Sequence, residues 1–98
     1  MSEKHELLIP EAAKRDASSF EILRLWIANQ GQHVSLKVGV WKDPAAWGIM
    51  LADLARHVAN SYREHAGMDF DKTLQRIRAG FDAELTSPTD MPGGSIED

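Results

Sequence analysis

The feature that most constrains the fold of this chain is a pair of apolar segments separated by a short polar turn. Residues 20–28 and 32–41 are rich in Ile, Leu, Val and Trp, and residues 29–31, with the sequence Asn-Gln-Gly, supply turn chemistry. The sequence therefore predicts an antiparallel β-hairpin. Because side chains alternate between the two faces of a strand, the pairing register decides what each face carries.

The pattern of aliphatic residues favours a loop with an even number of residues, centred on Gln30 and Gly31. Three aliphatic pairs then share one face of the hairpin: Ile27 with Val34, Leu25 with Leu36, and Leu23 with Val38. An odd loop, with Gly31 left-handed and a bulge, would put the two aliphatic stripes on different faces unless the bulge restored them. We therefore expect the even loop.

The opposite face of the predicted hairpin is mixed. Arg24 would lie opposite Lys37, and two directly opposed cations repel each other unless water or an anion separates them. Phe20, Trp26 and Trp41 also point to this face and need cover, because a lone hairpin is marginally stable. The cover would come from residues 7–9 or from a second copy of the chain, so we take Phe20, Trp26 and Trp41 as the candidate interaction surface.

A first amphipathic helix is predicted from Pro44 to about Ala66. Asp43 can accept a hydrogen bond from the first free amides, a proline suits the first helical position, and Gly67 can end the helix. The apolar residues recur at steps of three and four: Trp47, Met50, Leu51, Leu54, Val58 and either Ser61 or Tyr62.

A second helix is predicted to begin at Asp69, whose side chain can cap it. Its apolar stripe is narrow and continuous: Phe70, Leu74, Ile77, Phe81 and Leu85. Gly80 costs this helix roughly 1 kcal/mol relative to alanine. Gly67 and Met68 leave a tight link, so we expect the two helices to be neighbours that are antiparallel or steeply crossed.

The predicted fold class is α+β, with the antiparallel hairpin packed on the two helices. Residues 1–19 form an N-terminal arm, residues 20–85 form a single domain, and residues 86–98 form a flexible, disordered acidic tail with two prolines and two glycines. A chain of 98 residues leaves no room for a second domain.

Composition excludes several classes of function. The chain has no cysteine, which rules out disulfides, thiolate catalysis and Fe–S clusters. Its net charge of −4 comes from 11 Lys and Arg against 15 Asp and Glu, and five of the acids follow residue 81, so the folded body is nearly neutral. We therefore expect neither nucleic-acid nor membrane-surface binding. The sequence has no long apolar run and no signal peptide, which predicts a cytoplasmic protein.

Asp53 and His57 are four residues apart and share one helical face with Arg56. This arrangement could orient an imidazole for acid–base chemistry or supply two metal ligands. A solvated face is the favoured interpretation, because no third ligand converges on them. The sequence also lacks a glycine-rich phosphate motif and a nucleophile elbow. We therefore predict no catalytic, cofactor or metal-binding residues.

Four stretches of the sequence together resemble a small bacterial family of proteins of unknown function. They are residues 23–28 (LRLWIA), 31–36 (GQHVSL), 43–48 (DPAAWG) and 51–59 (LADLARHVA). The resemblance covers roughly residues 20–62, with a weaker similarity over residues 69–81. It implies a bacterial cytoplasmic protein, and it implies no activity, cofactor or site residue.

The function predicted from these observations is a non-enzymatic module for homo-oligomerisation or for binding a protein partner. Burial of the second hairpin face would add stability that a domain of this size needs. The alternative is a small-ligand-binding protein or enzyme, with a pocket between the hairpin and the first helix that uses Asp53, Arg56 and His57, and with Arg24 and Lys37 as further polar lining. A third alternative is an adaptor whose acidic tail docks elsewhere.

Overall fold

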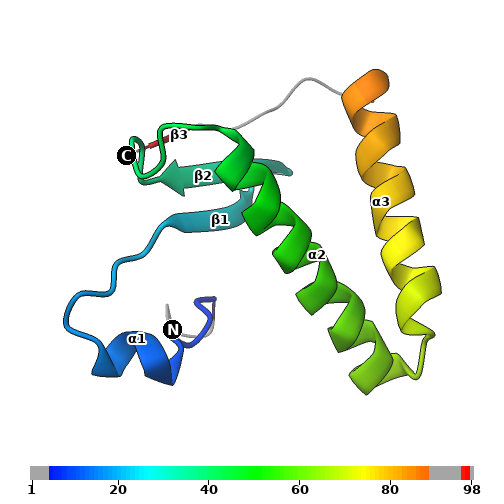
Figure 1. Cartoon of the computed structure of the whole chain (residues 1–98), viewed down its shortest axis with the longest axis horizontal. Helices are drawn as coiled ribbons and strands as arrows, with labels where there is room; N and C mark the ends of the chain where they lie inside the picture. Colours follow the sequence, from blue (N-terminus) through cyan, green and yellow to red (C-terminus); the bar gives the residue numbers. More distant parts are fainter. Residues whose placement is uncertain (1–4, 89–95, 98) are drawn as a thin grey trace. The chain divides into compact units, whose positions relative to one another are not determined.

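The computed structural model of the chain describes residues 5–88 and 96–97 and divides into two units (Figure 1). One unit runs to Val38 and includes residues 96–97, and the other begins at Gly39. The elements in chain order are α1 (Glu11–Arg15), β1 (Leu23–Ala28), β2 (Gly31–Leu36), α2 (Ala45–Ala66), α3 (Phe70–Thr86) and β3 (Ile96–Glu97). The hairpin and the helices confirm the predicted α+β class, whereas the packing of one on the other stays a prediction.

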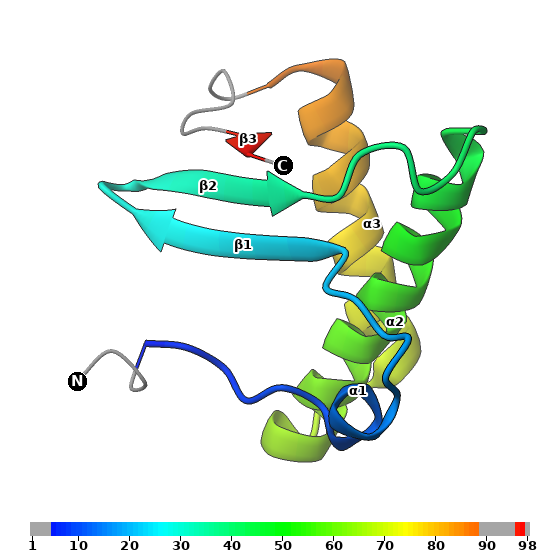
Figure 2. The same ribbon diagram turned by 90° about the vertical axis from the view of Figure 1, so that its left-hand side faces the viewer.

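The first unit is built on a three-stranded sheet with the order β1-β2-β3 (Figure 2). β1 and β2 are antiparallel, with Leu25 opposite Val34, and β3 is parallel to β2, with Ile96 beside Val34. β1 therefore lies at an edge of the sheet. Both paired strands are shorter than the predicted segments, since regular pairing ends at Leu23 and at Leu36.

The hairpin turn is Asn29-Gln30, so the predicted loop centre at Gln30 and Gly31 is wrong. Both turn residues have positive φ, 51° and 63°, as a two-residue type I′ turn requires. This turn has the twist that suits a hairpin, and asparagine tolerates the left-handed region well. Gly31 instead begins β2, opposite Ala28.

The observed pairing differs from the predicted one by two residues along β2, because Leu25 pairs with Val34 and not with Leu36. A shift by two leaves every side chain on its predicted face, since the side-chain period of a strand is two. One aliphatic face is therefore retained: Leu23, Leu25, Ile27, Val34 and Leu36.

The opposite face of the hairpin changes in its partners. Arg24 lies opposite Ser35, so the predicted opposition of Arg24 and Lys37 is wrong, and Trp26 lies opposite His33. The ring nitrogen Nε2 of His33 is 3.0 Å from the carbonyl oxygen of Ala28, at the turn end of the sheet.

A short structured connection joins α1 to β1 within the predicted N-terminal arm. The Ser19 hydroxyl donates to the Ala13 carbonyl at 2.7 Å, and the Ser18 amide donates to Asp16 Oδ1 at 2.9 Å. The Ser19 amide also donates to the Asp16 carbonyl at 3.0 Å. These three bonds turn the chain back on α1 before β1 begins.

In the second unit, the predicted helix boundaries are confirmed. Asp43 Oδ1 accepts from the Ala45 amide at 2.9 Å, and Asp69 Oδ2 accepts from the Lys72 amide at 2.9 Å, so both aspartates cap a helix. α2 ends at Gly67, whose φ of +68° is the left-handed conformation that glycine adopts without a Cβ clash.

α2 and α3 are joined at Gly67 and diverge from it (Figure 1). Ala59 and Thr73 are the two buried residues in the part of the chain that the structure describes. The apolar stripe of α3 becomes more exposed along the helix: Phe70, Leu74 and Ile77 are half-buried, and Phe81 and Leu85 are exposed. The two helices are therefore in closest contact near their link.

The predicted tail, residues 86–98, falls largely outside the described residues. Within it, Thr86 still belongs to α3, and residues 96–97 form β3, a strand that the sequence pattern did not predict. Across residues 5–88 and 96–97, the structure contains no helix with the length and hydropathy needed to cross a membrane.

Candidate functional site

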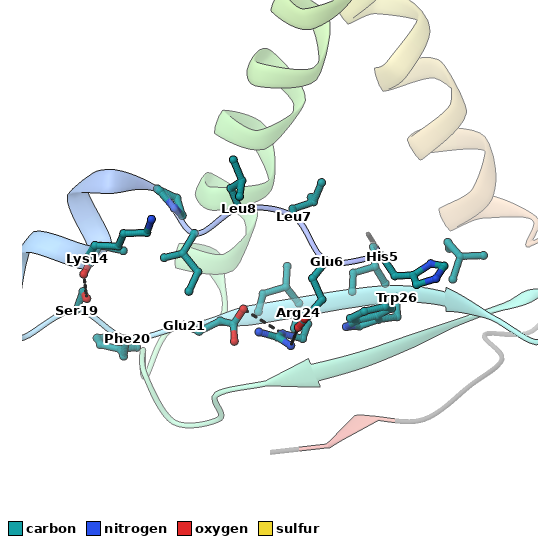
Figure 3. Close-up of a pocket in the computed structure, with 16 residues that line it drawn as sticks. His5, Glu6, Leu7, Leu8, Lys14, Ser19, Phe20, Glu21, Arg24 and Trp26 are labelled. Atoms are coloured by element: carbon teal, nitrogen blue, oxygen red, sulfur yellow. Dashed lines mark hydrogen bonds and ion pairs between the residues drawn. The ribbon is translucent and has the colours of Figure 1, made fainter. Parts of the chain in front are cut away.

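The first unit contains a groove between β1 and the residues that precede α1 (Figure 3). We call residues His5–Pro10 the leading segment and this space the β1 groove. The leading segment lines the groove on one side and residues 23–27 line it on the other, and the volume is about 930 Å³. This volume is near the upper end of the range for ligand pockets in proteins.

Arg24 connects the two sides of the β1 groove. Its guanidinium lies 3.2 Å from a carboxylate oxygen of Glu21 and 3.3 Å from a carboxylate oxygen of Glu6, which belongs to the leading segment. The hydrogen bond with Glu21, followed by the attraction of its charge, raises the pKa of Arg24 above its usual value. Arg24 is therefore a fixed cation with an acidic neighbour on each side, and all three side chains are exposed to solvent.

The backbone of β1 presents unpaired groups toward the groove. The Lys37 amide donates to the Ile22 carbonyl at 3.0 Å, so position 22 of the chain faces β2. Hydrogen-bonding groups alternate along a strand, so Arg24 and Trp26 also bond toward β2, while Leu23, Leu25 and Ile27 direct their amides and carbonyls outward. Because β1 is an edge strand, no strand of the described sheet pairs with these outward groups.

Two of the three residues predicted as an interaction surface lie at the β1 groove. Phe20 and Trp26 line it, and the ammonium of Lys37 lies 5.8 Å from the centre of the Phe20 ring. Trp41 belongs to the second unit, where its ring contacts Trp47 edge-on with centroids 5.3 Å apart. The assignment of Phe20, Trp26 and Trp41 to partner binding stays a prediction.

The second unit has its own groove, between α2 and α3, with a volume of about 620 Å³. Its lining is mainly aliphatic and aromatic: Leu51, Leu54, Val58, Leu74, Ile77 and Phe81. Charged groups are limited to Arg56, Arg78 and Asp82, and the last two form an ion pair at 3.7 Å. An apolar surface of this kind suits another protein segment better than a polar metabolite.

The structure places Asp53, Arg56 and His57 on an exposed stretch of α2. Arg56 and Asp53 form an ion pair at 3.5 Å, with 64% of each side chain exposed, and His57 is exposed as well. Within residues 5–88, no group of three His, Asp or Glu side chains is arranged to hold a metal ion. Arg56 lines the groove between α2 and α3, whereas Asp53 and His57 do not.

Sequence reasoning missed the pairing of Arg24 with Glu6 and the free edge of β1. The pair Glu21–Arg24 could have been found from its spacing of three residues. Glu6 is 18 residues from Arg24, and no local pattern links them. The free edge depends on which strand takes the end of the sheet, which is a property of the whole unit.

Comparison with known proteins identifies a family and similar solved structures. The model of a family described as a domain of unknown function (DUF5076) matches residues 6–89. A solved structure of a protein from the photosynthetic bacterium Rhodopseudomonas palustrus CGA009, provisionally named a pyruvate dehydrogenase, is 32% identical to this chain, with a TM-score of 0.70. The similarity covers 90% of each chain. A search of the curated proteins finds no match.

Proposed function

The chain belongs to the family described as a domain of unknown function (DUF5076), and from its surface we propose that it is a protein-interaction module that self-associates. The observation that carries this proposal is the exposure of large apolar side chains. Seventeen of them are exposed among the described residues, against two buried residues, Ala59 and Thr73. Monomeric soluble proteins rarely leave contiguous apolar surface open, because burial of such surface is the main source of stability.

The first unit carries the most exposed of these side chains. A sheet has two faces, and an apolar face that no other layer covers needs a partner. Leu7 and Leu8 in the leading segment are 95% and 91% exposed, and Phe20 and Trp26 lie at the same groove. These side chains support a partner surface on the first unit.

An enzymatic alternative has less support from the described residues. Asp53 and His57 lie on an open helix surface, and a catalytic pair needs a concave site that orients its substrate. The name pyruvate dehydrogenase belongs to the Rhodopseudomonas protein and assigns no activity to this chain. We also propose that the chain acts in the bacterial cytoplasm, because it lacks the cysteines from which small secreted domains usually build disulfides and because a similar structure is from a bacterium.

Sedimentation velocity tests the proposal. The chain should sediment as a dimer or larger species within a range of roughly 1 to 100 µM, with the monomer fraction rising on dilution. An apolar surface that is buried in the complex cannot tolerate a charge, so Leu8→Asp should shift the distribution to monomer. Ile49→Asp, at a 67% exposed position of α2, is the matched control and should sediment as the unmodified chain does.

Two results would count against this function. A monomer at every concentration would remove self-association. Equal sedimentation of Leu8→Asp and the unmodified chain would remove the first unit as the interacting surface. Far-ultraviolet circular dichroism on the same samples shows whether each variant keeps its helices, so that loss of the fold is separated from loss of the complex.

A further inference from the structure

We propose that the β1 groove is occupied by the leading segment of a second copy of the chain, which adds a strand to the edge of β1. This inference rests on the self-association proposed above and assigns the contact between the two copies to the β1 groove. The occupant is the stretch before α1 of the partner, and by symmetry each copy gives its own leading segment to the other.

The edge of β1 has main-chain groups that no strand of the described sheet pairs with. Leu23, Leu25 and Ile27 direct their amides and carbonyls away from β2. Arg24 is the one charged residue of this strand, which has no proline, so β1 has few of the devices with which proteins usually protect an open edge. An extended peptide that lies in the groove would satisfy these groups by main-chain hydrogen bonds.

The chain's own leading segment is held away from β1. Paired strands lie about 4.8 Å apart and leave no space between them, whereas here a groove of about 930 Å³ lies between the two. The two sides meet through the long side chains of Glu6 and Arg24 (Figure 3). The hydrogen bonds of Ser18 and Ser19 fix the connection from α1 to β1. The space is therefore open to a segment from outside the chain.

The leading segment has the chemistry that the groove requires. It contains no regular hydrogen-bonded structure from Leu7 to Ile9, so the backbone of these residues is free to pair, whereas the Pro10 carbonyl accepts from the Ala13 and Lys14 amides of α1. Leu7 and Leu8 are almost fully exposed, and Glu6 forms an ion pair with Arg24 within the chain. An incoming Glu6 would lie beside the Arg24 guanidinium, where charge is complementary, and the two leucines would face the apolar lining of the groove.

The exchange of leading segments produces a closed dimer. A two-fold axis between the two leading segments gives the strand order β1, partner segment, own segment, partner β1. In this order each leading segment keeps its place across the groove from its own β1, and the Glu6–Arg24 ion pair that spans the groove within one chain is exchanged for the same pair between the two chains. The contact is isologous, and such contacts form closed dimers. Direct pairing of the two β1 strands would instead displace both leading segments.

Disulfide trapping tests the exchange, and the absence of native cysteine makes each new thiol unique. Chains that carry Leu25→Cys are mixed with differently sized, tagged chains that carry Leu7→Cys or Leu8→Cys, and are oxidised with glutathione disulfide. Neighbouring residues of a strand point to opposite faces, and a disulfide needs Cα atoms about 4.4 to 6.8 Å apart. We therefore expect a covalent heterodimer with one of the two leucine positions and little with the other. Ile49→Cys in place of Leu25→Cys is the control and should give none.

Each other outcome overturns the exchange. Covalent homodimers of Leu25→Cys without heterodimers would indicate pairing of two β1 strands. A double variant, Leu8→Cys with Leu25→Cys, that forms its disulfide within one chain would indicate closure of the segment on its own strand. If the chain self-associates by sedimentation and no heterodimer forms, the exchange fails and the proposed function stands. If the chain is monomeric, the proposed function itself fails.

Amide hydrogen exchange supplies a second measurement on the unmodified chain. The Arg24 amide bonds toward β2 and should be protected at all concentrations, whereas the Leu25 amide points into the groove. The Leu25 amide should exchange about tenfold or more slowly when the chain is self-associated. Equal exchange of Leu25 in dilute and concentrated samples would overturn the proposal without any substitution.

Discussion

At the scale of single residues, the hairpin turn holds the least favourable backbone of the described chain. Asn29 and Gln30 both have positive φ, 51° and 63°. Asparagine enters the left-handed region easily because its short side chain can bond to the backbone nearby, but glutamine has no such compensation. Position 30 therefore carries strain that the type I′ turn imposes and that glycine would remove.

Gln30→Gly should stabilise the protein by about 1 kcal/mol, because it removes the steric cost of the left-handed conformation and creates the Asn-Gly pair that type I′ turns prefer. Urea denaturation followed by circular dichroism measures the change. Gln32→Gly is the matched control at an exposed position of β2, where glycine should destabilise by roughly 0.5 to 1 kcal/mol. A lower stability for Gln30→Gly than for the unmodified chain would contradict the prediction.

The same turn shows what could and could not be predicted from the residues of the hairpin. The two faces were predictable, because the aliphatic pattern has the period of a strand and survives a shift of two residues. The register was not, since Leu25 finds an aliphatic partner at Val34 and at Leu36 alike, and the choice depended on the twist of the turn. The contact of Trp41 with Trp47 was also missed, because it needs the path of the chain between strand and helix.

At the scale of elements, α3 has a capped first turn and exposed apolar side chains near its C-terminal end. Asp69 caps its first turn and the Arg63 guanidinium lies 5.6 Å from the centre of the Phe70 ring, whereas Phe81 and Leu85 are exposed. Gly80 lies in this exposed half, and a Cβ added there would meet no atom within 4 Å. The glycine is therefore not required by a close approach.

Gly80→Ala should stabilise the protein by roughly 1 kcal/mol, since alanine loses less backbone entropy than glycine in a helix and has space for its methyl group. Thermal unfolding followed at 222 nm measures the shift. Gly67→Ala is the matched control: its site is equally open, but φ is +68°, so alanine should destabilise. If Gly80→Ala lowered the midpoint, an unseen contact would have to occupy the space beside residue 80.

The helices were predictable in type and bounds because their signals are local. Asp43, Gly67 and Asp69 act on amides and carbonyls within four residues of themselves. β3 has two residues and pairs with a strand some sixty residues away, so no local signal marks it. The β1 groove was not predictable for the same reason, because Glu6 reaches Arg24 only after the chain has turned at Ser18 and Ser19.

At the scale of the whole molecule, the stability of this chain should depend on its concentration. A chain of 98 residues has a small margin between the free energy of burial and the entropy of ordering, and here most large apolar side chains of the described part are exposed. Each contact made with a partner therefore adds to a small total. Self-association and folding should then be linked by mass action.

The thermal midpoint measures this linkage. A tenfold higher concentration favours a folded dimer by about 1.4 kcal/mol, which for a domain of this size raises the midpoint by several degrees. Leu7→Ser together with Leu8→Ser should remove the dependence, because both leucines would lose the apolar surface that they bury on the partner, while their exposure in the single chain makes the monomer insensitive to the change. Ile49→Ser should keep the dependence. A midpoint that stays constant across concentrations in the unmodified chain would show that folding needs no partner, and the leading segment would then lose its role in stability.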